Sequence, residues 1–191
     1  MKIILACLLS VVSFAQQVNA TTSFDVDSFG QLTGINGIDM LGGRWDVDFL
    51  DGTAISIWGS NLEFDFTSKS EASVASNSLL TLFNTNPYAQ WSDTPANIRG
   101  INSSSAQIWT PYAVGSFGTI VEAEIFVNYG APRTDKLSSF WFGIQEDMSV
   151  NGENVFAVWT SVSAVPIPST VLFMGSALLS LLGFSRKPRD S

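Results

Sequence analysis

Apolar and polar residues alternate with a period of two in the first half of the chain. Over residues 45–49, Trp, Val and Phe stand at the odd positions, and Asp46 and Asp48 stand between them. This alternation predicts a half-buried strand. Asp51-Gly52 follows directly and is typical of a hairpin turn, because this dipeptide tolerates positive φ.

The same pattern continues after the turn. Residues 53–58 provide a return strand, and Leu62, Phe64 and Phe66 alternate with acidic residues as a third strand. We therefore expect an antiparallel meander over residues 45–66, with one apolar face and one wet, acidic face.

The period then changes to that of a helix. Ser68 and Glu71 form a capping box, and apolar residues recur at helical spacing over 69–83. A loop rich in Asn, Pro, Ser and Thr is expected over 84–105. Four further strands are predicted at 107–112, 119–128, 138–145 and 155–162. The fold class predicted for residues 21–163 is α+β: one domain, mainly antiparallel sheet, with one packed amphipathic helix.

The N-terminus has the pattern of a signal peptide. A basic Met1-Lys2 start precedes the apolar run 3–14, which is too short for a comfortable membrane span. Val18 and Ala20 fit the two pockets of signal peptidase, so we expect a signal helix in residues 1–20 and a mature chain that begins at Thr21. A buried N-terminal helix and a lipoprotein signal at Cys7 are the alternatives. The second lacks an apolar run before the cysteine.

The C-terminus carries a second processing pattern. An apolar run over 171–184 predicts a short hydrophobic transmembrane helix over about residues 169–185. The residues before the run are Val165, Pro166, Ile167, Pro168, Ser169 and Thr170, and the basic residues after it are Arg186, Lys187 and Arg189. The basic end should remain cytoplasmic, which leaves the domain on the far side of the inner membrane.

This tail resembles the PEP-CTERM sorting signal of Gram-negative bacteria, with Ile167 in place of the usual Glu. The resemblance implies export and recognition by an exosortase, a membrane cysteine protease that removes the tail in bacteria that make extracellular polysaccharide. An ordinary tail anchor is the alternative. Residues 44–53 also resemble an element of uncharacterised PEP-CTERM proteins, which implies a shared β-rich domain and no catalytic residues.

Charge and composition narrow the partners of the domain. Residues 21–165 contain five cations and sixteen carboxylates, a net charge of −11, and they contain neither Cys nor His. Such a domain is repelled by nucleic acid and by anionic lipid. It also lacks the commonest metal ligands and the commonest general base, so we expect no cofactor and no metal.

The acidic residues suggest two kinds of site. Glu122 and Glu124 share one face of a predicted strand, as Asp46 and Asp48 do, and a pair of carboxylates is what a glycosidase needs. A solvated outer sheet face is the simpler interpretation of both pairs. A surface cation site is the other hypothesis, with candidate ligands Asp25, Asp27, Asp46, Asp48 and Asp51.

Aromatic residues are the remaining candidates. Trp91, Trp109 and Trp141, with Tyr112 nearby in sequence, are expected in loops or on outer strand faces, where a ring can stack on a sugar. The sequence therefore predicts an exported, non-enzymatic surface or extracellular-matrix protein that binds exopolysaccharide through these rings. The alternative is a secreted carbohydrate-active enzyme that uses paired carboxylates.

Overall fold

The computed structural model describes residues 21–85 and 89–163. The predicted signal peptide with Ala20 and the predicted sorting tail from 164 onward lie outside these residues. The strands are β1 (Ser23–Val26), β2 (Leu32–Met40), β3 (Gly43–Leu50), β4 (Ala106–Val114), β5 (Ile120–Asn128), β6 (Lys136–Gly143) and β7 (Asn154–Val162). The helices are α1 (Ala54–Trp58), α2 (Lys69–Phe83) and α3 (Ala89–Ser92), with single 3-10 turns η1 (Pro95–Asn97) and η2 (Met148–Val150).

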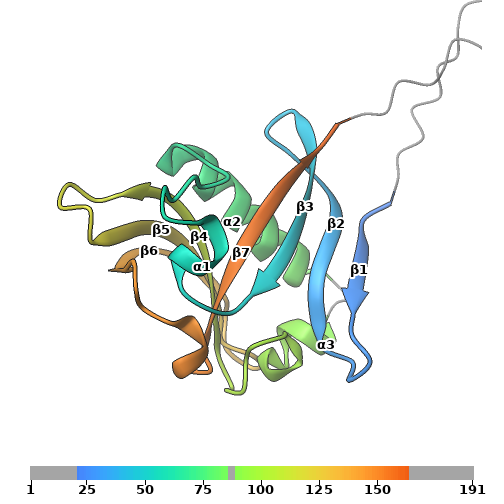
Figure 1. Cartoon of the computed structure of the whole chain (residues 1–191). Coiled ribbons are helices and arrows are strands. Elements are labelled where there is room, and N and C mark those ends of the chain that lie inside the picture. The colour runs from blue at the N-terminus through green and yellow to red at the C-terminus, as the bar shows by residue number, and fades with distance from the viewer. Residues whose placement is uncertain (1–20, 86–88, 164–191) are drawn as a thin grey trace, which may run out of the picture.

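The strands form one mixed sheet in the order β1-β2-β3-β7-β4-β5-β6 (Figure 1). Every neighbouring pair is antiparallel except β4 and β7, which run parallel. The predicted class, a β-rich α+β domain, is therefore confirmed, and the parallel pair is a feature that the sequence pattern did not predict.

The parallel pair is short, and the sheet divides beyond it. β4 and β7 pair only from Gln107 opposite Asn154 to Trp109 opposite Phe156. Pro111 follows on β4, and proline has no N–H to donate to a ladder. The two strands then diverge, so β7 stays with β3 while β4 stays with β5.

The meander predicted over residues 45–66 is wrong after β3. Thr53 caps a short helix instead: its side chain accepts from the backbone N–H of Ser56, and the Ser56 hydroxyl oxygen accepts from the backbone N–H of Thr53. This reciprocal cap satisfies helix-end donors and starts α1 where a return strand was expected. Residues 62–66 contain no strand, and the partners of β3 are β2 and β7.

Strand β2 was not predicted, because its apolar residues do not alternate. A bulge places Asn36 and Gly37 together opposite Asp46, between the pairs Ile35–Val47 and Ile38–Trp45. Gly37 has φ +74°, a conformation that side-chain-bearing residues rarely adopt. Its N–H donates to the Asp46 carboxylate at 2.7 Å. The bulge shifts the phase of the strand and hides the period of two.

The long helix and the later strands agree with the prediction. Ser68 accepts from the N–H of Glu71 and caps α2. Helix α2 buries Ala72, Ala75, Leu79 and Phe83 against one face of the sheet. The four strands predicted between 107 and 162 are β4, β5, β6 and β7, and every bound lies within two residues of its prediction. The expected loop over 84–105 contains α3 and η1 in its described part.

The sheet has a separate core on each face. Helix α2 covers one face along with Phe66, and α1 with residues 62–64 covers part of the other, over Phe142 and Phe156 (Figure 1). Because α1 and residues 62–64 cover only part of this face, the rest of it, over β4, β5 and β6, remains uncovered. Within 21–85 and 89–163, no helix has the length and apolar character needed to cross a membrane.

Candidate functional site

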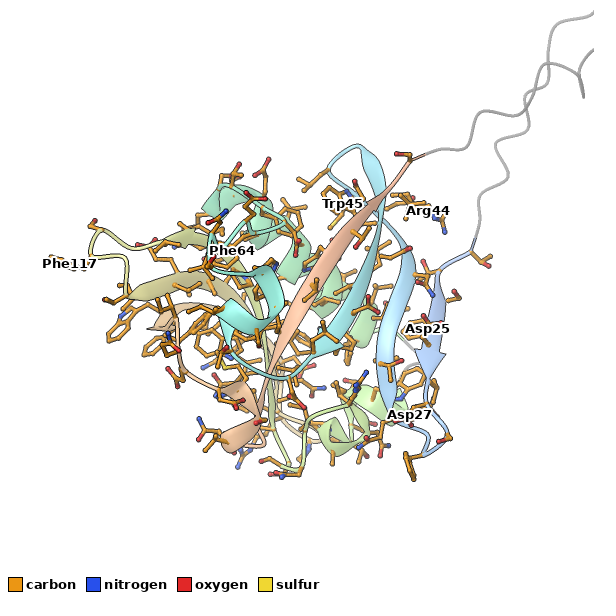
Figure 2. All side chains as sticks on the ribbon, in the orientation of Figure 1. Asp25, Asp27, Arg44, Trp45, Phe64 and Phe117 are labelled. Atoms are coloured by element: carbon orange, nitrogen blue, oxygen red, sulfur yellow. The ribbon has the colours of Figure 1, made fainter. Side chains whose placement is uncertain are left out.

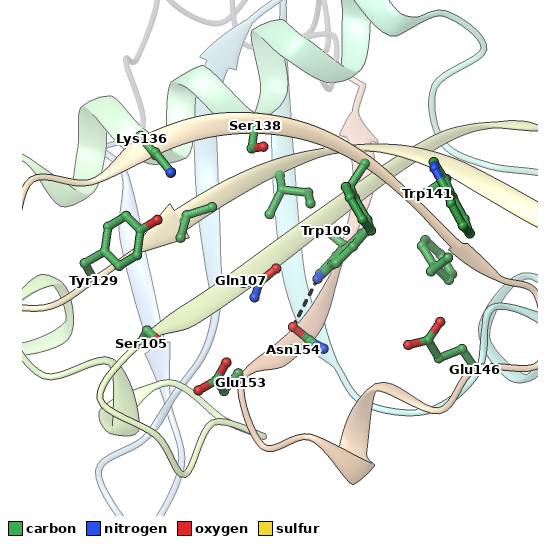
Figure 3. Close-up of a pocket in the computed structure, with 14 residues that line it drawn as sticks. Ser105, Gln107, Trp109, Tyr129, Lys136, Ser138, Trp141, Glu146, Glu153 and Asn154 are labelled. Atoms are coloured by element: carbon green, nitrogen blue, oxygen red, sulfur yellow. Dashed lines mark hydrogen bonds between the residues drawn. The ribbon is translucent and has the colours of Figure 1, made fainter.

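The uncovered face of β4, β5 and β6 forms an open groove of about 620 Å³. Figure 3 shows Gln107 and Trp109 of β4 along its floor, between two walls. Strand β6 supplies one wall, and the connection from β6 to β7 with the start of β7 supplies the other (Figure 3). The volume lies within the range that is usual for binding sites of small ligands.

On β4 and β5, strand alternation decides which residues face the groove. On β4, Gln107 and Trp109 line it, whereas Ile108 between them belongs to the core beneath α2. On β5, Ile125 and Val127 line it in the same way. Because side chains alternate between the faces of a strand, the period of two that builds the core also builds this surface.

Trp109 is a fixed part of the groove floor. Its ring is 5% exposed and lies edge-on to Phe142, with ring centroids 5.2 Å apart, and edge-on to Phe140 at 6.2 Å. Its indole N–H donates to Asn154 Oδ1 at 3.4 Å, the bond drawn in Figure 3. This bond uses the amide oxygen, so it fixes Asn154 with its NH₂ group left to act as a donor.

Phe140 and Trp141 form an exposed aromatic pair at the rim. Each is 57% exposed, and their rings are parallel within 2° with centroids 5.7 Å apart. Both lie on β6, the last strand of the sheet. Exposure of two large neighbouring rings is costly in water and is typical of a binding surface.

Charged side chains stand at intervals around the groove. Lys136 lies over the ring of Tyr129, with its Nζ 5.3 Å from the ring centroid. On the opposite wall, Glu146 Oε2 accepts from the N–H of Gly143 at 3.2 Å. Glu153 Oε1 accepts from the Ser103 hydroxyl at 2.9 Å. The groove therefore combines an aromatic floor and rim with one cation and two carboxylates.

Trp91 does not belong to this surface, although the sequence suggested it as a glycan contact. It is 6% exposed and stacks on Phe24 with ring centroids 5.1 Å apart and an angle of 8° between the rings. Its carbonyl oxygen accepts from the Asn128 amide at 3.0 Å. Trp91 joins α3 to β1 in the core, so it is a packing residue. The other two predicted tryptophans, Trp109 and Trp141, both line the groove.

The carboxylate pair predicted on β5 lies on the opposite face, towards α2. Glu124 is 4% exposed, accepts from the Ser139 hydroxyl at 2.6 Å, and has Lys69 Nζ 3.5 Å away. The expectation of a solvated outer face is therefore wrong for Glu124, because the N-terminus of α2 and β6 cover it.

Glu122 is half-buried beside Glu124 and accepts from the Tyr112 hydroxyl at 3.1 Å. Burial raises the pKa of the Tyr112 phenol to about 12, and the hydrogen bond to Glu122 and the charge of that carboxylate add to the rise. Tyr112 therefore stays protonated and donates to Glu122. The carboxylates of Glu122 and Glu124 are thus engaged by neighbouring side chains instead of lining an open cleft.

The candidate cation ligands in and near the first three strands interact with neighbouring residues of the domain. Asp25 accepts from the Asn36 amide at 2.8 Å, and Asp27 accepts from the N–H groups of its own turn (Figure 2). Partial burial raises the pKa of Asp48, and the carboxylates of Asp25 and Asp46 raise it further.

Asp51, the last candidate, lies at the other end of β3. Burial raises its pKa, and the Arg99 guanidinium opposes that rise. In the part of the chain that the structure describes, no three acidic residues gather into a group able to hold a metal ion.

Sequence reasoning missed most of the polar groove residues. Gln107, Glu146, Glu153 and Asn154 carry no motif, and they come together because β4 lies parallel to β7. The alternation of β4 could have placed Gln107 beside Trp109. The pairing of β4 with β7 could not be obtained from alternation.

The chain was compared with known proteins at three levels. It matches no family model, no curated protein and no solved structure. The groove and the terminal segments therefore carry the functional argument.

Proposed function

We propose that the chain is an exported surface or extracellular-matrix protein, sorted by an exosortase, whose domain binds exopolysaccharide without catalysing a reaction. The observation that carries the proposal is the exposed Phe140–Trp141 pair at the rim of a groove with an aromatic floor. Sugar rings present apolar C–H faces that stack on such side chains, and their hydroxyls bond to amides and carboxylates.

The groove offers both kinds of contact. Phe140 and Trp141 supply exposed ring surface, while Asn154 and Gln107 supply amide groups between the walls. Lys136 and Phe142 are six residues apart on β6, about 20 Å along an extended strand. A groove of that length, open along its top, suits a segment of a polymer better than a single sugar.

The terminal segments support display outside the cell. The signal-peptide pattern in 1–20 predicts export, and the Pro-rich segment with an apolar run and a basic end after Val165 predicts sorting. The start of β1 and the end of β7 lie on the same side of the domain, and the turn with Phe117 lies at the far side with β4, β5 and β6 (Figures 1 and 2). A domain held through either end would therefore present its groove away from the attachment.

The enzyme alternative has less support. Glu124 is engaged by Ser139 and Lys69 beneath α2, on the face opposite the groove. A glycosidase needs two carboxyl groups that flank the scissile bond from an accessible cleft. Because the predicted pair, Glu122 and Glu124, lies on the other face, we propose binding rather than hydrolysis for this domain.

The test is polysaccharide binding by residues 21–163, a segment that contains every residue of both cores. Exopolysaccharide from the producing bacterium serves as the ligand, with intrinsic tryptophan fluorescence or calorimetry as the readout. Trp141→Ala and Phe140→Ala should each weaken binding about tenfold or more while leaving the melting temperature nearly unchanged, because both rings are exposed. Binding unaffected by both substitutions would contradict the proposal.

Phe117 provides the matched control. It is 87% exposed in the turn between β4 and β5 and does not line the groove. Phe117→Ala removes more exposed aromatic surface than Phe140→Ala, 87% against 57% of the residue, but it lies outside the groove and should leave polysaccharide binding intact. An equal loss in all three variants would indicate non-specific hydrophobic adhesion rather than a site.

A further inference from the structure

We propose that the groove selects polysaccharides that carry free amino groups, a specificity that rests on the proposed function and names its ligand class. The inference comes from the charges around the aromatic floor. Glu146 and Glu153 line the wall opposite β6, and Lys136 lines the β6 wall (Figure 3).

The two carboxylates can still accept hydrogen bonds from a ligand. Among the described residues, Glu146 receives one hydrogen bond, on Oε2, and Glu153 receives one, on Oε1. The second oxygen of each carboxylate is therefore free to accept from an ammonium group. Glu146 is exposed and Glu153 is half-buried, so both can meet a ligand without first breaking a salt bridge.

Lys136 does not neutralise this acidic wall. Its ammonium lies over the Tyr129 ring, on the other side of the groove from Glu146 and Glu153 (Figure 3). An ammonium over an aromatic ring is stabilised where it is. Lys136 therefore stays near Tyr129. The carboxylates of Glu146 and Glu153 lie on the other wall, on the side of Asn154 (Figure 3).

The aromatic rings favour the same class of ligand. An ammonium group is attracted to the face of an indole or phenyl ring as well as to a carboxylate. A glucosamine-type sugar can thus stack its C–H face on Trp141, which is 57% exposed, and meet a glutamate with its amino group.

The overall charge excludes the opposite class. Residues 21–165 carry a net charge of −11, and the groove itself carries two carboxylates against one lysine. A polymer of uronic acids would be repelled during approach and again in the groove. A cationic polymer is steered to the domain by the same field.

The test compares two oligosaccharides with one backbone: a hexamer of glucosamine and its fully N-acetylated counterpart. Calorimetry on residues 21–163 at about pH 6 keeps the amino groups largely protonated. Two rim ion pairs predict about tenfold tighter binding of the amino hexamer, and this preference should shrink as salt is raised.

Glu146→Gln with Glu153→Gln should abolish the preference while leaving the affinity for the acetylated hexamer within about twofold, because glutamine keeps the acceptor oxygen. Asp39→Asn with Glu63→Gln is the control: both carboxylates are exposed outside the groove, and the change in net charge is equal. The control should keep the preference.

The outcomes separate this inference from the proposed function. Equal or tighter binding of the acetylated hexamer, lost in Trp141→Ala, overturns the amino-sugar specificity and keeps the glycan-binding function. Tighter binding of a uronic-acid oligomer overturns the specificity in the same way. Failure of every glycan, the native exopolysaccharide included, overturns the function itself.

Discussion

The carboxylate of Asp65 accepts a hydrogen bond of 2.8 Å from the backbone N–H of Trp159, although the two residues are 94 positions apart. Trp159 lies on β7 beyond the point where β4 ceases to pair with that strand. Its N–H therefore faces the side where the sheet has divided. Asp65 accepts the hydrogen bond that β4 would accept if its ladder with β7 continued. Residues 62–66 therefore lie where the two strands have separated.

This relationship gives a first prediction, on stability. Asp65→Ala leaves the Trp159 N–H without its acceptor in a largely buried place and should lower the free energy of unfolding by about 1–3 kcal/mol. Asp65→Asn keeps an acceptor oxygen and should cost much less. Urea denaturation of residues 21–163 measures both. Equal losses in the two variants would contradict the assigned role of the hydrogen bond.

The pH dependence of the same pair has a definite sign. Burial raises the pKa of Asp65, and the Trp159 N–H opposes part of that rise. The folded state thus holds the proton more tightly than the unfolded state, so the contribution of Asp65 to stability falls as pH rises through the folded pKa. The stability of Asp65→Asn relative to the native chain should therefore increase from acidic to neutral pH.

The segment around Asp65 also shows where sequence reasoning succeeds and fails. The alternation of Leu62, Phe64 and Phe66 correctly indicated inward apolar residues, since Phe66 joins one core and the other two pack against the second. The predicted strand was wrong, because Leu62 has φ +50° and the segment spans the division between two cores. Side-chain burial was predictable from the pattern, whereas the backbone conformation depended on tertiary contacts.

Strands β4 to β7 were predicted correctly, although β4 has a register shift between Pro111 and Ala113. Strand β7 contains an unbroken apolar run over residues 155–159 and pairs with β3 over seven consecutive residues without a bulge, so its local pattern and its tertiary role agree. Strand β2 contains the Asn36–Gly37 bulge, and its apolar spacing gave no period-two signal. In the groove, Trp109 and Trp141 were predictable as aromatic residues on strands, while Glu146 and Glu153 depend on how distant strands pair.

A second prediction concerns the titration of Tyr112. Burial, with the hydrogen bond to Glu122, raises the pKa of its phenol to about 12, above the ordinary value of 10.0. Spectrophotometric titration of the folded domain should show one tyrosine that ionises later than an ordinary one, and Tyr112→Phe should remove that late step.

The sign of the linked stability change follows from the raised pKa. The folded state retains the Tyr112 proton over a range in which the unfolded state has lost it, so this contribution is complete below about pH 10 and is lost as pH rises towards 12. Tyr112→Phe should therefore show a weaker loss of stability over that range. Identical alkaline profiles in the two proteins would count against the Tyr112–Glu122 hydrogen bond.

A third prediction separates the tryptophans. Trp91→Ala removes a buried ring that stacks on Phe24 and should lower the free energy of unfolding by about 3–5 kcal/mol. Trp141→Ala removes a mainly exposed ring and should change stability by no more than about 1 kcal/mol. Denaturation curves for the two variants, taken together with glycan binding, decide the roles. A large loss of stability in Trp141→Ala would make it a core residue instead.

The fourth prediction concerns the tail that begins at Val165, in which the apolar run is short for a permanent anchor. A helix of about 14–17 residues covers roughly 21–26 Å, against a hydrocarbon core of about 30 Å. If the apolar run spans the membrane, Pro166 and Pro168 are expected to keep the chain just outside it extended, as a protease requires. By the positive-inside rule, Arg186, Lys187 and Arg189 are expected to keep the basic end in the cytoplasm.

If the tail is a signal for an exosortase, Pro166→Ala with Pro168→Ala should trap a full-length, membrane-bound precursor, since alanine lets the helix extend into the cleavage segment. Mass spectrometry of protein from cells and medium of the native host reads the C-terminus directly. The native chain should end before the apolar run, and the double variant should end at Ser191. A native chain that also ends at Ser191 would identify the tail as a plain membrane anchor, because an exosortase would have removed it.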